Sequence, residues 1–113
     1  MPDEVKATDP TTGGSKGRKL ARPSLLPMDA LHALAEHYGR GAAKYEDRNW
    51  ERGYPWSWTV DALLRHLFAL WQGEDIDTET GSLHATAVAW HALALLTFQL
   101  RGIGTDDRPK GKV

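Results

Sequence analysis

The residues of this sequence best suited to chemistry are histidines and acids placed within or beside apolar segments. His84 and His91 are seven residues apart, about 700° of helical rotation, so both imidazoles face nearly the same side of a helix. They therefore interrupt an otherwise apolar stripe. Two such histidines either contact phosphate or a metal, or are core histidines bonded to backbone or water. The spacing leaves both interpretations open.

The preceding apolar segment carries a second group of charged residues. Asp61 and Arg65 are four residues apart, which on spacing alone favours a surface ion pair within one helix. Arg65 and His66 point about 100° apart beside the same apolar stripe, so one of them must lie at the margin of the core. A guanidinium held there can bind a nucleotide phosphate through two parallel hydrogen bonds.

An acidic connector over residues 73–81 carries four carboxylates, those of Glu74, Asp75, Asp77 and Glu79. Closely spaced oxygen ligands suit Mg²⁺ or Ca²⁺, but the glycine and the final glutamate of an EF-hand are not at their required places. The pattern predicts either a divalent-metal site or a solvated acidic loop.

The segment over residues 41–50 combines cations, an amide, a phenol and an indole, which belong to Lys44, Tyr45, Asn49 and Trp50 among others. Aromatic faces stack on bases, and Lys or Arg neutralises phosphate, so this segment is suited to bind a nucleotide. The alternative is a connector between helices whose aromatic side chains fill the core.

Three apolar segments with helical periodicity must position these groups, at about residues 27–39, 57–73 and 82–101. Ser57 is a good N-cap for the second helix, and Gly102 is a good C-terminal stop for the third. We therefore predict an all-α fold, a small three- to four-helix bundle that forms a single domain over residues 21–102. Residues 1–20 and 103–113 have little to bury and are predicted to be disordered tails.

The composition of the chain excludes several classes of protein. The formal net charge of −1 argues against a protein that coats nucleic acid. There is no cysteine, so a bound metal would have oxygen or imidazole ligands. With no recognisable signal peptide and no apolar run as long as a membrane span, a cytoplasmic protein is expected. The third helix is apolar around most of its circumference, which favours a central position or the seam of a homodimer or higher homo-oligomer.

Several of these segments recur together in one known family. The matching segments are Gly41-Ala42-Ala43-Lys44-Tyr45 with Arg48-Asn49-Trp50, Leu64-Arg65-His66-Leu67, Gly73-Glu74-Asp75-Ile76-Asp77, and Glu79-Thr80-Gly81 with His84. In this order and approximate spacing they resemble the phage and prophage family of dATP/dGTP diphosphohydrolase N-terminal domains, which is loosely grouped with MazG-like pyrophosphohydrolases. The likeness covers about residues 19–100.

The resemblance implies an all-α domain in the cytoplasm of a phage-infected or prophage-carrying bacterium. The implied reaction hydrolyses a purine dNTP to dNMP and pyrophosphate, with two Mg²⁺ ions that bridge the phosphates and activate water. The implied catalytic carboxylates, which would also bind the metal, are Glu36, Asp61, Glu74 and Asp75. Further metal contacts would come from Asp77 and His84. The residues that would contact the purine nucleotide are Lys44, Tyr45, Asn49, Trp50, Arg65, His66 and His91.

The sequence also departs from this family pattern. MazG-like enzymes typically present Glu-x-x-Glu on one helix and Glu-x-x-Asp on the next, whereas here the first helix offers Asp29 and Glu36 and the second offers Asp61. Relatives often carry His and Asn at the positions of Ala87 and His91. These departures favour an alternative function, a non-catalytic module that sequesters a nucleotide. A structural or interaction domain is the third alternative.

Overall fold

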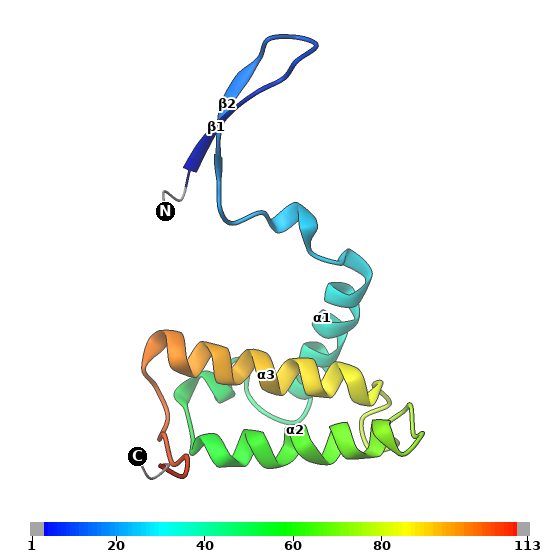
Figure 1. Cartoon of the computed structure of the whole chain (residues 1–113). Coiled ribbons are helices and arrows are strands. Elements are labelled where there is room, and N and C mark those ends of the chain that lie inside the picture. Colours follow the sequence, from blue (N-terminus) through cyan, green and yellow to red (C-terminus); the bar gives the residue numbers. More distant parts are fainter. Residues whose placement is uncertain (1–3, 111–113) are drawn as a thin grey trace.

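Two antiparallel helices, α2 and α3, form the body of the molecule (Figure 1). The computed structural model describes residues 4–110. In chain order its elements are β1 (Glu4–Thr8), β2 (Ser15–Lys19), η1 (Pro23–Leu25), α1 (Met28–Ala42), η2 (Asn49–Arg52), α2 (Trp56–Trp71) and α3 (His84–Arg101). The three predicted helices are therefore present. Within the described residues, no helix is long and apolar enough to cross a membrane.

A β-hairpin stands where the first disordered tail was expected. β1 and β2 pair antiparallel with Glu4 opposite Lys19 and Thr8 opposite Ser15. The turn is closed by the Asp9 carboxylate, which accepts hydrogen bonds from the backbone of the two threonines that follow Pro10. The prediction of an all-α fold is therefore wrong, because the chain combines three α-helices with a two-stranded antiparallel sheet. The hairpin was missed because its side chains are almost all exposed, so it has no alternating apolar pattern.

The segment after α3, which was predicted to be a tail, contacts the start of α2. Gly102 ends α3 in the left-handed conformation, as predicted, and turns the chain back toward α2. The Trp56 indole N–H donates to the Ile103 carbonyl at 3.1 Å, and the Asp107 carboxylate accepts a bond from the backbone N–H of Ser57 at 2.9 Å. The Asp107 carboxylate thus accepts the hydrogen bond from the first turn of α2, a role that was predicted for the Ser57 side chain. The remaining parts of the two predicted tails, residues 1–3 and 111–113, lie outside the described residues.

The core is small and lies between α2 and α3. Among the described residues, the apolar side chains that are less than a tenth exposed are Trp56, Ala87, Ala94 and Phe98. Phe98 is fully buried, and the rings of Tyr54 and Trp50 lie with centroids 5.2 and 6.2 Å from its own. These rings come from the segment that leads into α2, so burial of Phe98 fixes that segment against α3.

The first helix is attached to this body at one end. Within the described residues α1 packs on α3 and not on α2, and its C-terminal half makes the aromatic contact, with Tyr38 5.7 Å from Trp90. The segment before it, residues 4–27, which we call the arm, extends away from the body (Figure 1). The radius of gyration is accordingly 18.7 Å, whereas a compact domain of about 100 residues has a value of about 13 Å.

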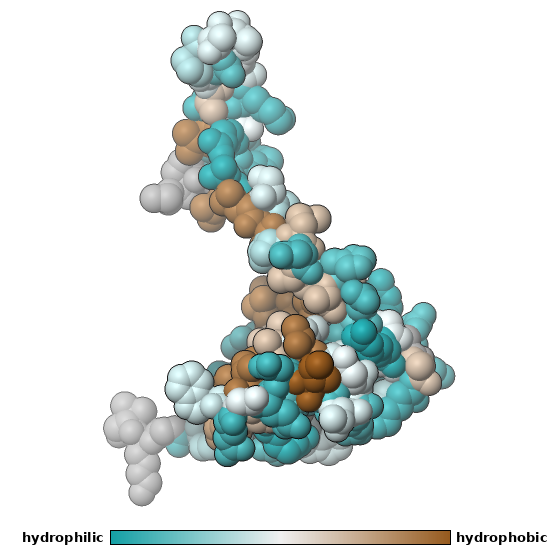
Figure 2. Space-filling model, turned by 90° about the vertical axis from the view of Figure 1, so that its right-hand side faces the viewer, coloured by the Kyte–Doolittle hydropathy of each residue, from teal (hydrophilic) through white to brown (hydrophobic). Residues whose placement is uncertain are grey.

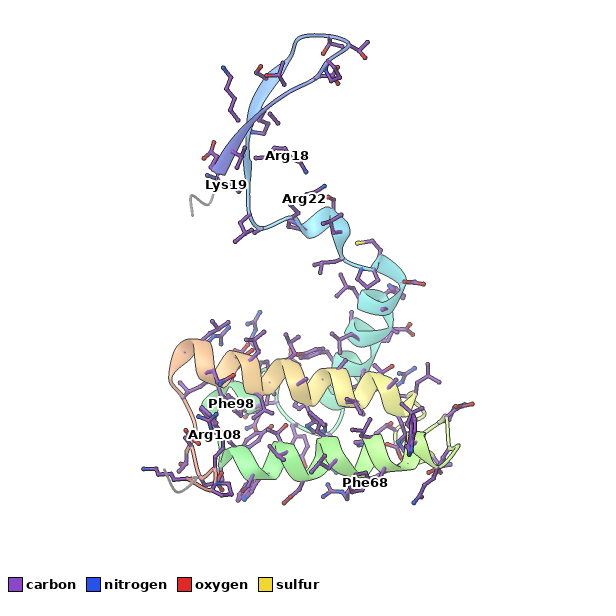
Figure 3. All side chains as sticks on the ribbon, in the orientation of Figure 1. Arg18, Lys19, Arg22, Phe68, Phe98 and Arg108 are labelled. Atoms are coloured by element: carbon purple, nitrogen blue, oxygen red, sulfur yellow. The ribbon has the colours of Figure 1, made fainter. Side chains whose placement is uncertain are left out.

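Two phenylalanines in different surroundings test this description of the core. Phe98 lies between the helices, whereas Phe68 is 60% exposed on α2 (Figure 3). We expect Phe98→Ala to reduce the free energy of unfolding by about 3–5 kcal/mol, through lost burial and a new cavity. Phe68→Ala should cost about 1 kcal/mol or less. Urea unfolding followed by circular dichroism measures both. If Phe98→Ala does not fold, Phe98→Leu should give a smaller loss of the same sign. Equal losses at the two positions would contradict this core.

Candidate functional site

Four of the five histidines gather where the three helices meet, and we call them the histidine cluster: His37, His66, His84 and His91. The Nδ1 atoms of His66 and His84 are 2.9 Å apart, so one imidazole donates a hydrogen bond and the other accepts it. The ring of His66 also stacks on that of His91, with centroids 5.9 Å apart. Periodicity places His84 and His91 on one side of α3. Packing against α2 then brings His66 between them.

The acidic connector folds back onto the first turn of α3. The backbone N–H of His84 donates to the Asp75 carbonyl at 2.8 Å, and a carboxylate oxygen of Glu74 lies 3.3 Å from its Nε2. That Nε2 atom is buried and has no well-aligned hydrogen bond within the described residues. Its contact with Glu74 becomes an ion pair when the imidazole is protonated. The connector therefore brings the carboxylate of Glu74 and the backbone carbonyl of Asp75 to the histidine cluster.

A third acid of the connector, Asp77, forms a turn at the same place. Its carboxylate accepts hydrogen bonds from the Thr80 hydroxyl at 2.9 Å and from the Glu79 backbone at 3.1 Å. Burial acts to raise the pKa of Asp77, but these bonds, together with the nearby His66 and His84, lower it below the usual value. The group is thus a stable anion beside the imidazoles.

Ser82 joins the first helix to this connector, and sequence reasoning did not single it out as a site residue. Ser82 is 3% exposed, and its hydroxyl oxygen lies 2.7 Å from Nδ1 of His37. Arg40, one turn further along α1, donates to the same oxygen at 2.8 Å. The spacing of His37 and Arg40 puts them on one face of the helix. That spacing was the available signal, but their common partner is 42 or more residues away.

Burial lowers the pKa of three imidazoles of this cluster, those of His37, His66 and His91, and so favours their neutral form. Burial is the main cause that lowers the pKa of His91 to about 4, and the neighbouring His66, His37 and Arg65 act in the same direction. The pKa of His37 is lowered by burial and by Arg40, and that of His66 is lowered chiefly by burial. A neutral imidazole can accept a proton or donate a hydrogen bond, so these groups can serve as a base or as phosphate contacts.

Beside the histidine cluster lies a cavity of about 750 Å³, which we call the aromatic cavity. The residues that line it are Tyr38, Gly39, Gly41, Tyr45, Glu46, Asp47, Arg48, Asn49, Trp50, Glu51, Tyr54, Trp58, Thr59, Trp90 and His91. The Tyr54 and Trp58 rings stack with centroids 5.9 Å apart. The Thr59 hydroxyl lies 2.8 Å from Nδ1 of His91. Because His91 lines the cavity and also stacks on His66, the two parts of the site are continuous.

The loop that lines the aromatic cavity is fixed by the backbone conformations of Arg48 and Gly53 as well as by contacts between aromatic rings. Arg48 adopts a left-handed conformation, with φ of 61°, directly before η2. Gly53 has φ of 85°, and a Cβ there would lie 2.6 Å from the backbone nitrogen of Gly104. A larger residue at position 53 would therefore push the returning C-terminal segment off the loop.

The structure brings two sets of the predicted residues together. The first set meets at the start of α3 and contains His66, His84, Glu74, Asp75 and Asp77. The second set lines the aromatic cavity and contains Tyr45, Asn49, Trp50 and His91.

Other predicted residues lie apart from these sets. Glu36 pairs with His32 and Arg40 on its own helix, at 3.5 and 4.0 Å, and Asp61 is exposed. Lys44 lies over the Tyr45 ring at 5.4 Å, and Arg65 is exposed beside His66. Within residues 4–110, no group of three or more His, Asp or Glu is arranged to hold a metal. The donor groups of the described residues thus do not fit the two magnesium ions that the resemblance implies, and magnesium stays a prediction.

The lowered pKa of His91 predicts how stability depends on pH. Between its usual value of 6.5 and about 4, the unfolded chain binds a proton at this side chain that the folded chain does not. The contribution of His91 to the free energy of unfolding is therefore fully present above about pH 6.5, and it is lost as the pH falls toward 4. We expect Tm to fall over this range and His91→Asn to flatten the fall. His32→Asn, a change at an exposed histidine, should leave the slope unaltered. Identical slopes for both variants would contradict the assignment.

Comparison with known proteins identifies the family. A family model described as "dATP/dGTP diphosphohydrolase, N-terminal" matches residues 10–108. No curated protein and no solved structure gave a match. The matched range contains the aromatic cavity, the histidine cluster and the acidic connector, and it confirms the resemblance seen in the sequence. The chain therefore belongs to the family of dATP/dGTP diphosphohydrolase N-terminal domains.

Proposed function

We propose that this domain binds a purine deoxynucleoside triphosphate, with the base in the aromatic cavity and the phosphates toward the histidine cluster. The observation that carries the proposal is the continuity of the two parts through His91, which lines the cavity and stacks on His66. A ligand with one flat apolar end and one anionic end fits such a site. The cavity volume of about 750 Å³ lies in the usual range for small-molecule sites.

The charges around the site support this orientation of the nucleotide. Glu46, Asp47 and Glu51 line the cavity, so they disfavour phosphate there and can accept hydrogen bonds from the amino group of a base. Arg48 also lines the cavity, but it is paired with Glu51 at 3.3 Å. Two cations lie near the histidine cluster: Arg40 donates to Ser82, and exposed Arg65 lies near His66. Guanidinium groups bind phosphate oxygens in pairs of hydrogen bonds. Aromatic rings that stack on the base add about 1–3 kcal/mol per base.

Hydrolysis is the second candidate function, and the family match favours it. In this reaction water attacks the α-phosphorus, the bond to the bridging oxygen breaks, and dNMP and pyrophosphate leave. His66, which burial keeps neutral, is suited to take the proton from the water. Because the described residues provide no metal-binding group, binding without turnover ranks first. The binding module needs the cavity and the cations but no converging carboxylates.

A substitution at the cavity tests the binding site. Tyr45 is 59% exposed and lines the cavity, so Tyr45→Ala should weaken dATP and dGTP binding without unfolding the chain. Loss of one stacking partner predicts an increase in Kd of about 5- to 100-fold. Trp71→Ala removes an aromatic ring that is 88% exposed and does not line the cavity, and should leave Kd unchanged. Isothermal titration calorimetry measures both. Equal effects of the two substitutions would place the base elsewhere.

Metal removal separates the two candidate functions. We expect calorimetry to detect dATP or dGTP binding in the presence of EDTA, because the chain by itself presents no converging metal ligands. A parallel assay with Mg²⁺ looks for pyrophosphate released from each dNTP. Release that EDTA and His66→Ala both abolish would establish the hydrolase, whereas binding without release would establish the module. If no purine nucleotide binds under either condition, both candidates fail.

A further inference from the structure

One side of α3 is apolar although nothing within the described residues covers it. The seven exposed residues on this side lie within an arc of about 120°. They form what we call the outer flank of α3: Ala85, Ala89, Ala92, Leu93, Leu96, Gln99 and Leu100. Leu96 and Leu100 are 48% and 78% exposed. The outer flank points away from the core residues Ala87, Ala94 and Phe98 of the same helix, and it carries no charged residue.

The outer side of α2 differs in this respect. Leu64, Phe68 and Trp71 are exposed there, but Asp61 and Arg65 are exposed beside them and interrupt the apolar surface. A solvated helix ordinarily carries charges on its wet side. The outer flank of α3, with one polar side chain and no charged one, is therefore an apolar surface that charges do not interrupt and that a partner can cover.

The arm supplies the charge that identifies the partner. It carries seven charged side chains among the described residues, five of which are cationic: Lys6, Lys16, Arg18, Lys19 and Arg22. Arg18, Lys19 and Arg22 lie along the arm, far from α2 and α3 (Figure 3). Lys19 pairs with Glu4 at 2.8 Å, whereas Arg18 and Arg22 form no ion pair within residues 4–110. The acidic connector is the complementary surface, with four carboxylates in six positions.

We propose that the outer flank of α3 packs against the same flank of a second copy of this chain, and that the arm of each copy lies on the acidic connector of the other. A two-fold axis makes both contacts occur twice, because every contact from one copy to its partner is repeated in reverse. Figure 2 shows hydrophobic surface both along the arm and on the helical body, as this arrangement requires. The proposal does not depend on nucleotide binding.

The size of the surface explains why the arm must take part. An 18-residue helix is about 27 Å long and about 10 Å wide, so one flank covers roughly 300 Å² on each copy. A specific interface buries about 1,000 Å² or more in total. The arm adds exposed apolar side chains, among them Leu20, Leu25 and Leu26. The arm therefore enlarges the contact beyond what the flank alone provides.

Sedimentation velocity on the full chain tests the apolar contact. The wild-type chain is expected to be a dimer, and Leu96→Lys with Leu100→Lys is expected to be a monomer with an unchanged helical circular dichroism spectrum. Phe68→Lys, on the outer side of α2, is the matched control and should stay dimeric. If the double variant does not fold, Ala89→Glu adds one charge at an exposed position of the same flank. A monomeric wild-type chain, or dissociation by Phe68→Lys instead of the flank variants, overturns the proposal.

A charge exchange between two chains tests the arm. Arg18→Glu with Arg22→Glu places like charges against the acidic connector, and Asp75→Lys with Glu79→Lys places like charges against the arm. Each variant alone should dissociate already at a higher protein concentration than wild type, because its dimer is weaker, and salt should reduce the difference. An equimolar mixture of the two variants should recover the dimer. In the mixed dimer the acidic arm of one chain meets the basic connector of the other, and the second contact joins an unchanged arm to an unchanged connector. A mixture that dissociates like its two parents overturns the contact between copies, as does a chain that stays monomeric while its arm binds DNA.

Discussion

The packing of α2 against α3 around Phe98 is the interaction on which the other features depend. Phe98 is fully buried, and it is surrounded by rings from the segment that enters α2. The C-terminal segment returns to the same end of the pair, where Trp56 and Ser57 hold it. Because so few apolar side chains are fully buried among the described residues, this contact carries a large share of the hydrophobic stabilisation. The relative position of the two helices fixes the distances between His66 and His84 and between Thr59 and His91.

At the other end of the same pair, polar groups take the place of the apolar core. His66 meets His84 across the two helices, the acidic connector folds onto His84, and Ser82 is bonded by two side chains of α1. Buried polar groups are costly unless they are paired, and here His37 and Arg40 are both paired with Ser82, as is His66 with His84. The adjoining cavity of about 750 Å³ provides space for a ligand beside the cluster. A flat base and an anionic tail suit these two surroundings.

The outward surfaces of the molecule differ in character, and this difference bears on assembly. The outer flank of α3 carries no charged residue, whereas the outer side of α2 includes Asp61 and Arg65. The arm keeps an excess of positive charge away from the body, and the acidic connector keeps an excess of negative charge on it. Within a single chain the outer flank of α3 stays exposed and the charges of the arm lie far from those of the acidic connector. A second copy can cover the flank and pair these charges.

The sequence by itself determined the three helices, the stop at Gly102 and the family, because periodic apolar residues, glycine at a helix end and a run of ordered motifs are local signals. It also pointed to His66, His84 and the acids of the connector as candidates. It missed the hairpin, whose order rests on the Asp9 turn and on paired strands without an apolar face. The tertiary structure alone decided that His37, Arg40 and Ser82 belong beside those histidines, and that Glu36 and Asp61 do not join them in a metal-binding group. The physical reason is that contacts between residues more than 40 positions apart depend on how helices cross, and no local pattern encodes that.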